Sequence, residues 1–378
     1  MKKSLLAAAV LGAFAGSAMA ANVALYGVVD TGLQYTHSKV VSDGETIEKN
    51  NSFEMKSGNQ LGSRWGLKGV EDLGNGYKVG FILESGFDSD TGKGKDQFFN
   101  RESSLFVEGS FGRLLFGRMG SVNQGVSSTG RIDMISAFGT SYGDYSSNAL
   151  GVFAGGKVLP NMITYQSPTF SGLQIHAQYA MSNDDGDGAD ENKARKTDRY
   201  FALAATYSNG PLSLYGAVDA TDYAHDKGEK HHTASTYTLG GNYDFGVVKL
   251  FGALQYFNEY EISEFQGAFE DVFYGARVKG WGAQLSAAVP LAGGTMLAGV
   301  GYMDGKMAKS EEWWFSKNDV TRIRATVGYA YPLSKRTQVY AAASYGKEDC
   351  EWGFTDEPDN YKDKANYATA FIGLRHTF

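Results

Sequence analysis

The sequence predicts an all-β fold, a closed antiparallel barrel of sixteen transmembrane strands with an inward-folded third outer loop. Runs with a period of two residues recur along the chain, and short turns alternate with long polar loops between them. The composition has 49 glycines and 46 tyrosines and phenylalanines but only 6 prolines, which suits long twisted strands. No linker or change of composition divides the 378 residues into separate domains.

The N-terminal segment, residues 1–20, has the pattern of a secretory signal peptide. Two lysines precede an apolar run from Leu5 to Ala15, and Ala18-Met19-Ala20 matches the small-residue cleavage pattern. An anchoring helix is the alternative, but the apolar run is shorter than the roughly 20 residues that a membrane-spanning helix needs. We therefore expect export, cleavage after Ala20 and a single barrel domain over residues 21–378.

The charge and the cysteine content restrict the partners and the source of stability. Without the two N-terminal lysines, 33 basic residues face 42 acidic ones and the net charge is about −9, which argues against a nucleic-acid partner. The lone Cys350 has no partner for an intramolecular disulfide, although export leads to an oxidising compartment. The stability must therefore come from another source.

The first strand-like run covers residues 23–35 and alternates for about a dozen residues. Its apolar set and its polar set are Leu25, Val29, Leu33 and Tyr35 against Tyr26, Asp30 and Gln34. A hairpin follows around the tight turn at residues 71–76. Its second strand places Tyr77, Val79, Phe81 and Leu83 opposite Lys78, Glu84 and Asp88. A face that carries lysine and glutamate must be in contact with water.

The number of turns and loops determines the strand count. Short turns lie near residues 71–76, 110–113, 167–172, 208–211, 244–246, 291–294 and 332–336. Long loops lie near residues 37–58, 88–97, 120–157, 183–197, 223–233, 259–276, 304–319 and 348–365. Alternation of these two sets requires sixteen strands of roughly ten residues each, the length that crosses a bilayer when tilted.

The last run, residues 367–378, alternates in the same way and ends the chain on Phe378. Its apolar and polar sets are Ala370, Ile372, Leu374 and Phe378 against Thr369, Gly373, Arg375 and Thr377. Pairing of this strand with residues 23–35 would remove both edges of the sheet. Closure is required because an unpaired backbone group in lipid costs several kcal/mol.

The segment from 120 to 157 is far too long for an ordinary hairpin connection, and loops of this length are usually functional. Its only acids are Asp133 and Asp144, and its only bases are Arg131 and Lys157. The strand count makes it the third outer loop. We expect it to fold into the barrel and to set the width of a pore.

Five pieces of the sequence carry a resemblance to a known family. They are VALYGVVDTGLQY, GSRWGLKGVEDLGNGYKVGFILESGF, FNRESSLFVEGSFGRLLFGR, NMITYQSPTFSGLQIHAQY and FIGLRHTF. In these pieces and their order the chain resembles the trimeric general diffusion porins of Gram-negative outer membranes, particularly the β-proteobacterial type. Between Asn183 and Asp363 only the spacing of loops and turns supports the resemblance.

The resemblance implies a homotrimer in the outer membrane, in contact with lipid and lipopolysaccharide, whose third loop forms an eyelet opposite a basic wall. Mapped by motif, the wall bases are Arg64 in SRWGLKG, Arg101 in FNRESSL and Lys157 before NMITYQSPTFSG. Arg118 in LLFGRM is a further wall base. Asp133 in GRIDMISAFG takes the main acidic position of the loop.

This chain departs from the family pattern at two positions. Ala137 stands where enteric relatives carry a glutamate, so the acidic side of the eyelet is thinner. Lys157 replaces the usual arginine, which keeps the charge but loses the planar guanidinium.

Alternatives also remain open: Arg64 and Arg101 can serve as salt-bridge partners on the wet wall, Asp133 as a turn former, and Arg131 as a brace of the loop.

The expected function is a passive channel for small hydrophilic solutes and ions that weakly prefers anions, because the wall bases outnumber the loop acids. We expect no enzymatic activity, no cofactor and no metal site. No Walker glycine loop, zinc-protease helix motif or GxSxG elbow is present, and the acidic run from Asp185 has Ala189 and Lys196 at calcium-ligand positions. The alternatives are a substrate-specific channel, for example for sugars, hinted at by Tyr142 and Tyr145, and an outer-membrane barrel enzyme.

Overall fold

The computed structural model describes residues 23–125, 127–139, 142, 151–181, 193–195, 198–226, 232–261, 277–307, 315–354 and 360–378. The expected signal peptide, Asp144, Tyr145 and the start of the acidic run at Asp185 lie outside these residues. Among the described residues, no helix combines the length and the apolar character that crossing a membrane requires.

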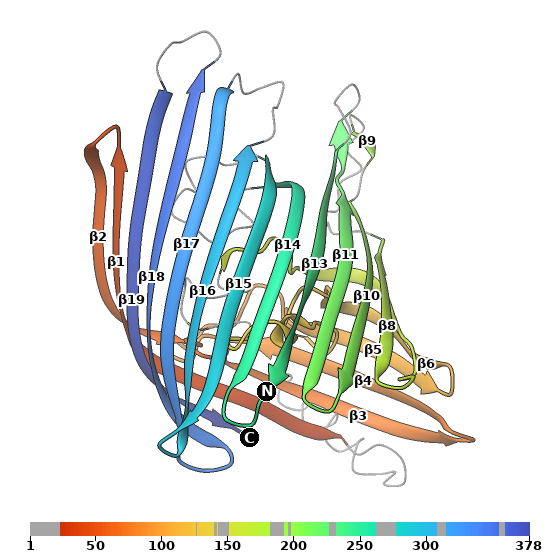
Figure 1. Ribbon diagram of the computed structural model, residues 1–378. Coiled ribbons are helices and arrows are strands. Elements are labelled where there is room, and N and C mark those ends of the chain that lie inside the picture. The colour runs from red at the N-terminus through yellow and green to blue at the C-terminus, as the bar shows by residue number, and fades with distance from the viewer. Residues whose placement is uncertain are drawn as a thin grey trace, which may run out of the picture.

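The strands and the short helix η1 follow one another along the chain (Figure 1). Their bounds are β1 (Ala24–Ser42), β2 (Glu45–Ser57), β3 (Arg64–Gly74), β4 (Tyr77–Gly86), β5 (Glu102–Gly109), β6 (Gly112–Gly120), η1 (Ile132–Met134), β7 (Val158–Gln166), β8 (Leu173–Ala180), β9 (Lys193–Arg195), β10 (Arg199–Asn209), β11 (Leu212–Asp222), β12 (His225–Asp226), β13 (Thr233–Asp244), β14 (Lys249–Glu261), β15 (Arg277–Leu291), β16 (Gly294–Met307), β17 (Phe315–Pro332), β18 (Thr337–Phe354) and β19 (Asn360–Thr377).

All of these strands except β9 and β12 form one antiparallel sheet that closes on itself. Both β2 and β3 pair with β1. β2 pairs with the second half of β1, and β3 pairs with the first five residues of β1. They therefore share one position, and the barrel has sixteen strand positions. β19 pairs with β1 from Val28↔Thr377 to Ser42↔Asp363 and so closes the ring. The predicted sixteen-stranded closed barrel is confirmed.

The short turns fall where the sequence predicts them, but the prediction of long loops at residues 37–58 and 348–365 was wrong, because most of each segment is strand. Residues 37–58 form most of a β1–β2 hairpin, whose tight turn is Asp43-Gly44. Both turn residues have positive φ, 47° and 89°, as a two-residue turn of the I′ type requires. The Asp-Gly signal lies within a polar run, and for that reason the segment resembled a loop. Several strands also exceed the expected length: β1 has 19 residues and β17 has 18.

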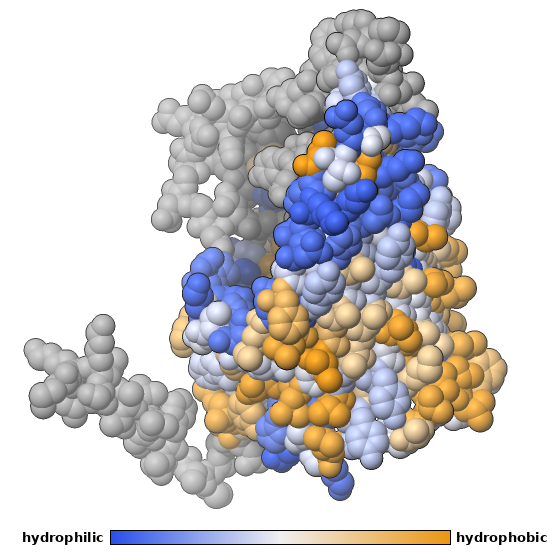
Figure 2. Space-filling view, turned by 90° about the vertical axis from the view of Figure 1, so that its left-hand side faces the viewer, coloured by the Kyte–Doolittle hydropathy of each residue, from blue (hydrophilic) through white to orange (hydrophobic). Residues whose placement is uncertain are grey.

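The side chains of each strand alternate between the inside and the outside of the barrel. On β1, Leu25 and Leu33 are 62% and 40% exposed, whereas Asp30 and Gln34 are fully buried inside. Figure 2 shows hydrophobic side chains gathered over the lower part of one face, with hydrophilic side chains above them. This band fits a surface in contact with lipid.

Candidate functional site

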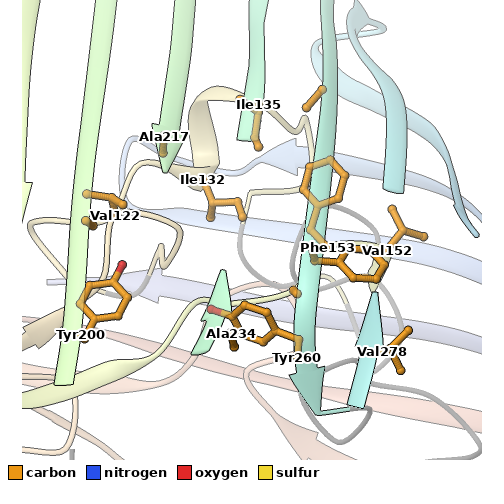
Figure 3. Close-up of a cluster of buried hydrophobic side chains, with 14 of the residues drawn as sticks. Val122, Ile132, Ile135, Val152, Phe153, Tyr200, Ala217, Ala234, Tyr260 and Val278 are labelled. Carbon is orange, nitrogen blue, oxygen red and sulfur yellow. The ribbon is translucent and has the colours of Figure 1, made fainter. Parts of the chain in front are cut away.

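The described parts of residues 121–157, between β6 and β7, fold into the barrel, and we refer to this segment as the lumen loop (Figure 1). Figure 3 shows how its apolar side chains pack against the inner wall. Val122, Ile132 and Ile135 are at most 1% exposed, as are Val152 and Phe153. They belong to one buried cluster with wall residues that include Tyr200, Ala217, Ala234, Tyr260 and Val278. Burial of this apolar surface holds the loop against the wall.

Polar contacts also hold the loop to the same wall. Asn123 donates to Asp219 Oδ2 at 3.1 Å and accepts from the Tyr215 hydroxyl at 2.8 Å. Further along, wall side chains pair with the loop backbone, which has no sheet partners there. These pairs are Gln178 with Val122 N, Asn242 with Met134 O, Ser286 with Ala137 N, and Gln255 with Ala154 N and O. The loop therefore follows the wall from β8 to β15.

The helix η1 presents Asp133 to the interior of the barrel. Its neighbours Ile132 and Ile135 are 1% and 0% exposed and point into the wall cluster, so the intervening Asp133 is exposed. Arg131 Nη1 donates to the carbonyl groups of Ser128 at 3.0 Å and Gly130 at 2.6 Å. It braces the loop, as one of the alternatives from the sequence proposed.

A cavity of about 390 Å³ lies between the lumen loop and the wall formed by β16 to β19. Among the described residues, Asp133 and Arg375 are the two charged side chains that line it. The other lining residues are Gln60, Leu61, Gly125, Ala137, Phe138, Gly139, Tyr142, Leu297, Ala330 and Gln338. Ala137 thus lines the cavity without a charge.

Arg64 and Arg101 lie together on the inner wall beside Glu84 of β4. Arg101 Nε is 2.6 Å from Glu84 Oε1, and Arg64 Nε is 3.4 Å from Glu84 Oε2. The side chains of Arg101 and Arg64 are 11% and 18% exposed. The two arginines therefore form ion pairs with one carboxylate, yet each keeps some contact with the water of the lumen.

Lys68 extends this basic wall on the same face of β3. It lies four residues after Arg64, and its Nζ is 5.0 Å from the centre of the Tyr26 ring. The Tyr26 hydroxyl donates to Glu84 Oε2 at 3.0 Å. Alternation along a strand places residues 64, 66 and 68 on one face. Lys68 is exposed, so its charge is in contact with water.

Arg118 and Lys157 lie apart from this group. Arg118 pairs with Ser103 in the β5–β6 register, on the face that also carries the outward-facing Leu105 and Phe116. Its Nε donates to the Asn100 carbonyl at 3.3 Å. Lys157 ends the lumen loop, and its Nζ donates to the Tyr223 hydroxyl at 3.3 Å. The structure thus brings Arg64 and Arg101 together and places the other two bases elsewhere.

Two contributors to the cavity were missed from the sequence. The sequence pattern placed Arg375 correctly on the polar face of the last strand, but nothing local showed that it lies opposite Asp133. Residues 58–63, which we call the inner segment, place Gln60 and Leu61 in the cavity. The signal that could have found this segment is Gly58 with Gly62, a pair that weakens a regular strand.

The comparisons with known proteins agree with this architecture. A family model described as Gram-negative porin matches residues 7–350. The chain is 32% identical to an outer membrane porin protein of Bordetella pertussis, over 100% of both chains. It is 30% identical to outer membrane porin protein 32 of Delftia acidovorans, over 92% of this chain and 90% of that protein.

Solved structures with the same fold include the anion-selective porin from Comamonas acidovorans. That structure has a TM-score of 0.62 and 24% identity, and the match covers 95% of this chain and 100% of that one. A trimer form of OmpT from Vibrio cholerae matches with a TM-score of 0.59 and 14% identity, over 95% of this chain and 100% of that chain. At these identities the likeness concerns the fold.

Proposed function

The chain belongs to the Gram-negative porin family, and we propose that its pore weakly prefers anions, with the narrowest part between Asp133 and the wall of Arg64, Arg101 and Arg375. As a porin, it is a passive diffusion channel of the outer membrane. A barrel of sixteen strands is wide enough to leave an aqueous channel. Selectivity must therefore come from the folded loop and the fixed charges beside it.

The observation that carries this proposal is the imbalance of charge across the lumen. Arg64, Arg101, Lys68 and Arg375 face the lumen, whereas Glu84 offsets one of the arginines and Asp133 opposes them from the loop. Asp30 is fully buried, so it contacts no water in the pore. Two unit charges about 4 Å apart interact by roughly 1 kcal/mol in water. The residual excess of positive charge is small, which makes the expected preference weak.

A substrate-specific sugar channel would need exposed aromatic rings along the bore. Here the rings nearest the cavity pack against one another: Tyr142 lies 5.3 Å from Phe138 and 6.2 Å from Phe371, measured between ring centres. Tyr142 and Phe371 are only 4% exposed. This packing supports a general channel, and we assign no catalytic step to the protein.

We also propose that the protein is exported by cleavage after Ala20 and assembles as a homotrimer among lipid and lipopolysaccharide. Support for a trimer comes from the OmpT trimer form with the same fold. Further support is an apolar groove on the outer face at the β1–β19 seam, lined by residues such as Leu33, Phe53 and Ala370. N-terminal sequencing should give Ala21 first. Light scattering in detergent should give three times the mass of the chain, and a monomer would contradict the assembly.

The selectivity is tested by reversal potentials in planar bilayers with a salt gradient across them. The purified wild-type protein should give a potential of the sign that anion preference requires, and its size should be well below the limit for an ideal anion channel. A potential of the opposite sign would show cation preference and would contradict the proposal. Unselective conduction would show that Asp133 balances the wall.

A further inference from the structure

The inner segment, residues 58–63, interrupts the second strand position of the barrel at the level of the cavity. β2 ends at Ser57 and β3 begins at Arg64, and both pair with β1. Gly58 has a φ of 75°, a conformation that glycine adopts without strain. Between the two strands the chain leaves the sheet, and Gln60 and Leu61 line the cavity.

Asp30 of β1 holds this segment in place. Its Oδ2 accepts the backbone N–H groups of Gln60 at 3.0 Å and Leu61 at 2.7 Å. Its Oδ1 accepts the hydroxyl of Tyr340 from β18. The carboxylate is fully buried, and hydrogen bonds from N–H and O–H groups to an ionised acceptor are stronger than neutral ones. The backbone N–H of Asp30 also donates to Ser63 Oγ at 3.0 Å, at the other end of the segment.

The inner segment in turn connects both sides of the cavity. Gln60 Nε2 donates to the hydroxyl of Tyr142 in the lumen loop at 2.7 Å. Arg64 Nη1 donates to the carbonyl of Gly62 at 3.2 Å. A Cβ atom at position 62 would lie 3.2 Å from Nη1 of Arg101. The segment therefore contacts the lumen loop and Arg64, and it lies beside Arg101.

We propose that Asp30 is a positioning residue that sets the bore, because it keeps residues 58–63 in the lumen as a second constriction element opposite the lumen loop. Without the carboxylate, two backbone donors and the Tyr340 hydroxyl lose their common acceptor. Only Val29 and Asp30 of β1 lie opposite the six residues 58–63, so the segment remains a bulge, but it is free to move away from its place in the lumen. Leu61 then leaves the cavity, and Tyr142 loses its partner. This inference rests on the proposed location of the constriction.

Single-channel conductance of Asp30→Ala and Asp30→Asn separates this role from a purely electrostatic one. Both changes remove the charge, but asparagine keeps an oxygen that can accept the two backbone N–H groups. Conductance should rise by roughly 1.5-fold in Asp30→Ala and by clearly less in Asp30→Asn. Equal changes in the two variants, or no change in either, would overturn the proposal. Tyr340→Phe removes one donor and no charge, and it should raise the conductance slightly. This variant still tests the proposal if Asp30→Ala fails to fold.

A thiol test reports the position of the segment directly. In a Cys350→Ala background, Leu61→Cys should react with a negatively charged methanethiosulfonate reagent, and the current should fall. Adding Asp30→Ala should remove most of this block, whereas the block at Ala137→Cys in the lumen loop should persist. An undiminished block at position 61 would overturn the role of Asp30. If the reagent does not reduce the current of the Ala137→Cys variant, the proposed location of the constriction is contradicted, and the inference fails with it.

Discussion

Asn123 of the lumen loop donates its side-chain amide to the buried carboxylate of Asp219 on β11 at 3.1 Å. The two residues are 0% and 1% exposed. Asp219 also accepts the hydroxyl groups of Tyr200 at 3.0 Å and of Thr236. A buried carboxylate is costly unless its oxygens are hydrogen-bonded. The loop thus contributes a donor that the wall needs, and the wall fixes the point at which the loop turns into the lumen.

Replacement of Asn123 by alanine should loosen the lumen loop at this point. The change removes the donor to Asp219 and the acceptor for Tyr215. A buried polar group that is left without a hydrogen-bond partner lowers the stability by about 1–3 kcal/mol. We expect higher conductance and more current noise in single-channel records. Asn50→Ala on the exposed part of β2 is the matched control and should match the wild type. A quiet channel of normal conductance in Asn123→Ala would mean that the apolar contacts alone hold the loop.

Replacement of both Arg64 and Arg101 by glutamine should lower the anion preference. Both side chains keep some contact with lumen water, and a unit charge at about 4 Å changes the energy of an ion by roughly 1 kcal/mol, or about fivefold in local concentration. Reversal potentials measure the effect. The control replaces Lys306 and Lys362, which are 65% and 56% exposed near the outer ends of β16 and β19. Equal effects of the two pairs would point to diffuse surface charge.

Glu84→Gln should act in the opposite direction. The change keeps the side-chain volume and one oxygen for the Arg101 contact, but it removes the charge that Arg64 and Arg101 share. The anion preference should rise above that of the wild type in the same reversal-potential assay. Loss of the barrel, seen as loss of heat-modifiable migration in gels, would show instead that the glutamate is needed to hold the two arginines together. A folded variant with reduced anion preference would contradict the assigned roles.

Ala137→Glu should move the selectivity toward cations. Ala137 lines the cavity four residues after Asp133, and its backbone N–H donates to Ser286 Oγ at 3.0 Å. A carboxylate there would stand on the same side as Asp133 and oppose Arg375. Ala137→Gln adds a similar volume without the charge, so it measures the steric part of any change in conductance. If both variants shift the reversal potential equally, position 137 does not contribute to the filter through charge.

The alternation of residues along the strands was enough to predict the barrel, because a period of two is a local property of the chain. Leu33 and Asp30 on β1, or Ile372 and Arg375 on β19, could be assigned to opposite faces from the sequence alone. The length of residues 120–157 marked a functional loop, and the resemblance to porins, carried by the flanking motifs, added the expectation that this loop folds inward. The β1–β2 hairpin was missed although its Asp43-Gly44 turn is a local signal.

The composition of the site depended on contacts between residues far apart in the sequence. Asp30 meets the inner segment 30 positions away and Tyr340 310 positions away, and no local pattern indicates such pairs. Arg375 could be assigned to a face but not to a position opposite Asp133. The shared carboxylate of Glu84 was also hidden, since Arg64 and Arg101 meet it from different sides.

The anion preference should weaken steadily as the salt concentration rises. The charges behind it lie in or beside the water of the lumen: Lys68 is exposed, Arg64 is 18% exposed, and Asp133 is exposed on the loop. Screening lengths fall from about 30 Å at 0.01 M to about 3 Å at 1 M, so at high salt each mobile ion senses only the charge next to it. Permeability ratios from reversal potentials at a fixed gradient, repeated over this range, should converge toward the ratio of the free ions. A ratio independent of salt would indicate selection by bore width, and the double variant of Arg64 and Arg101 should then behave as the wild type does.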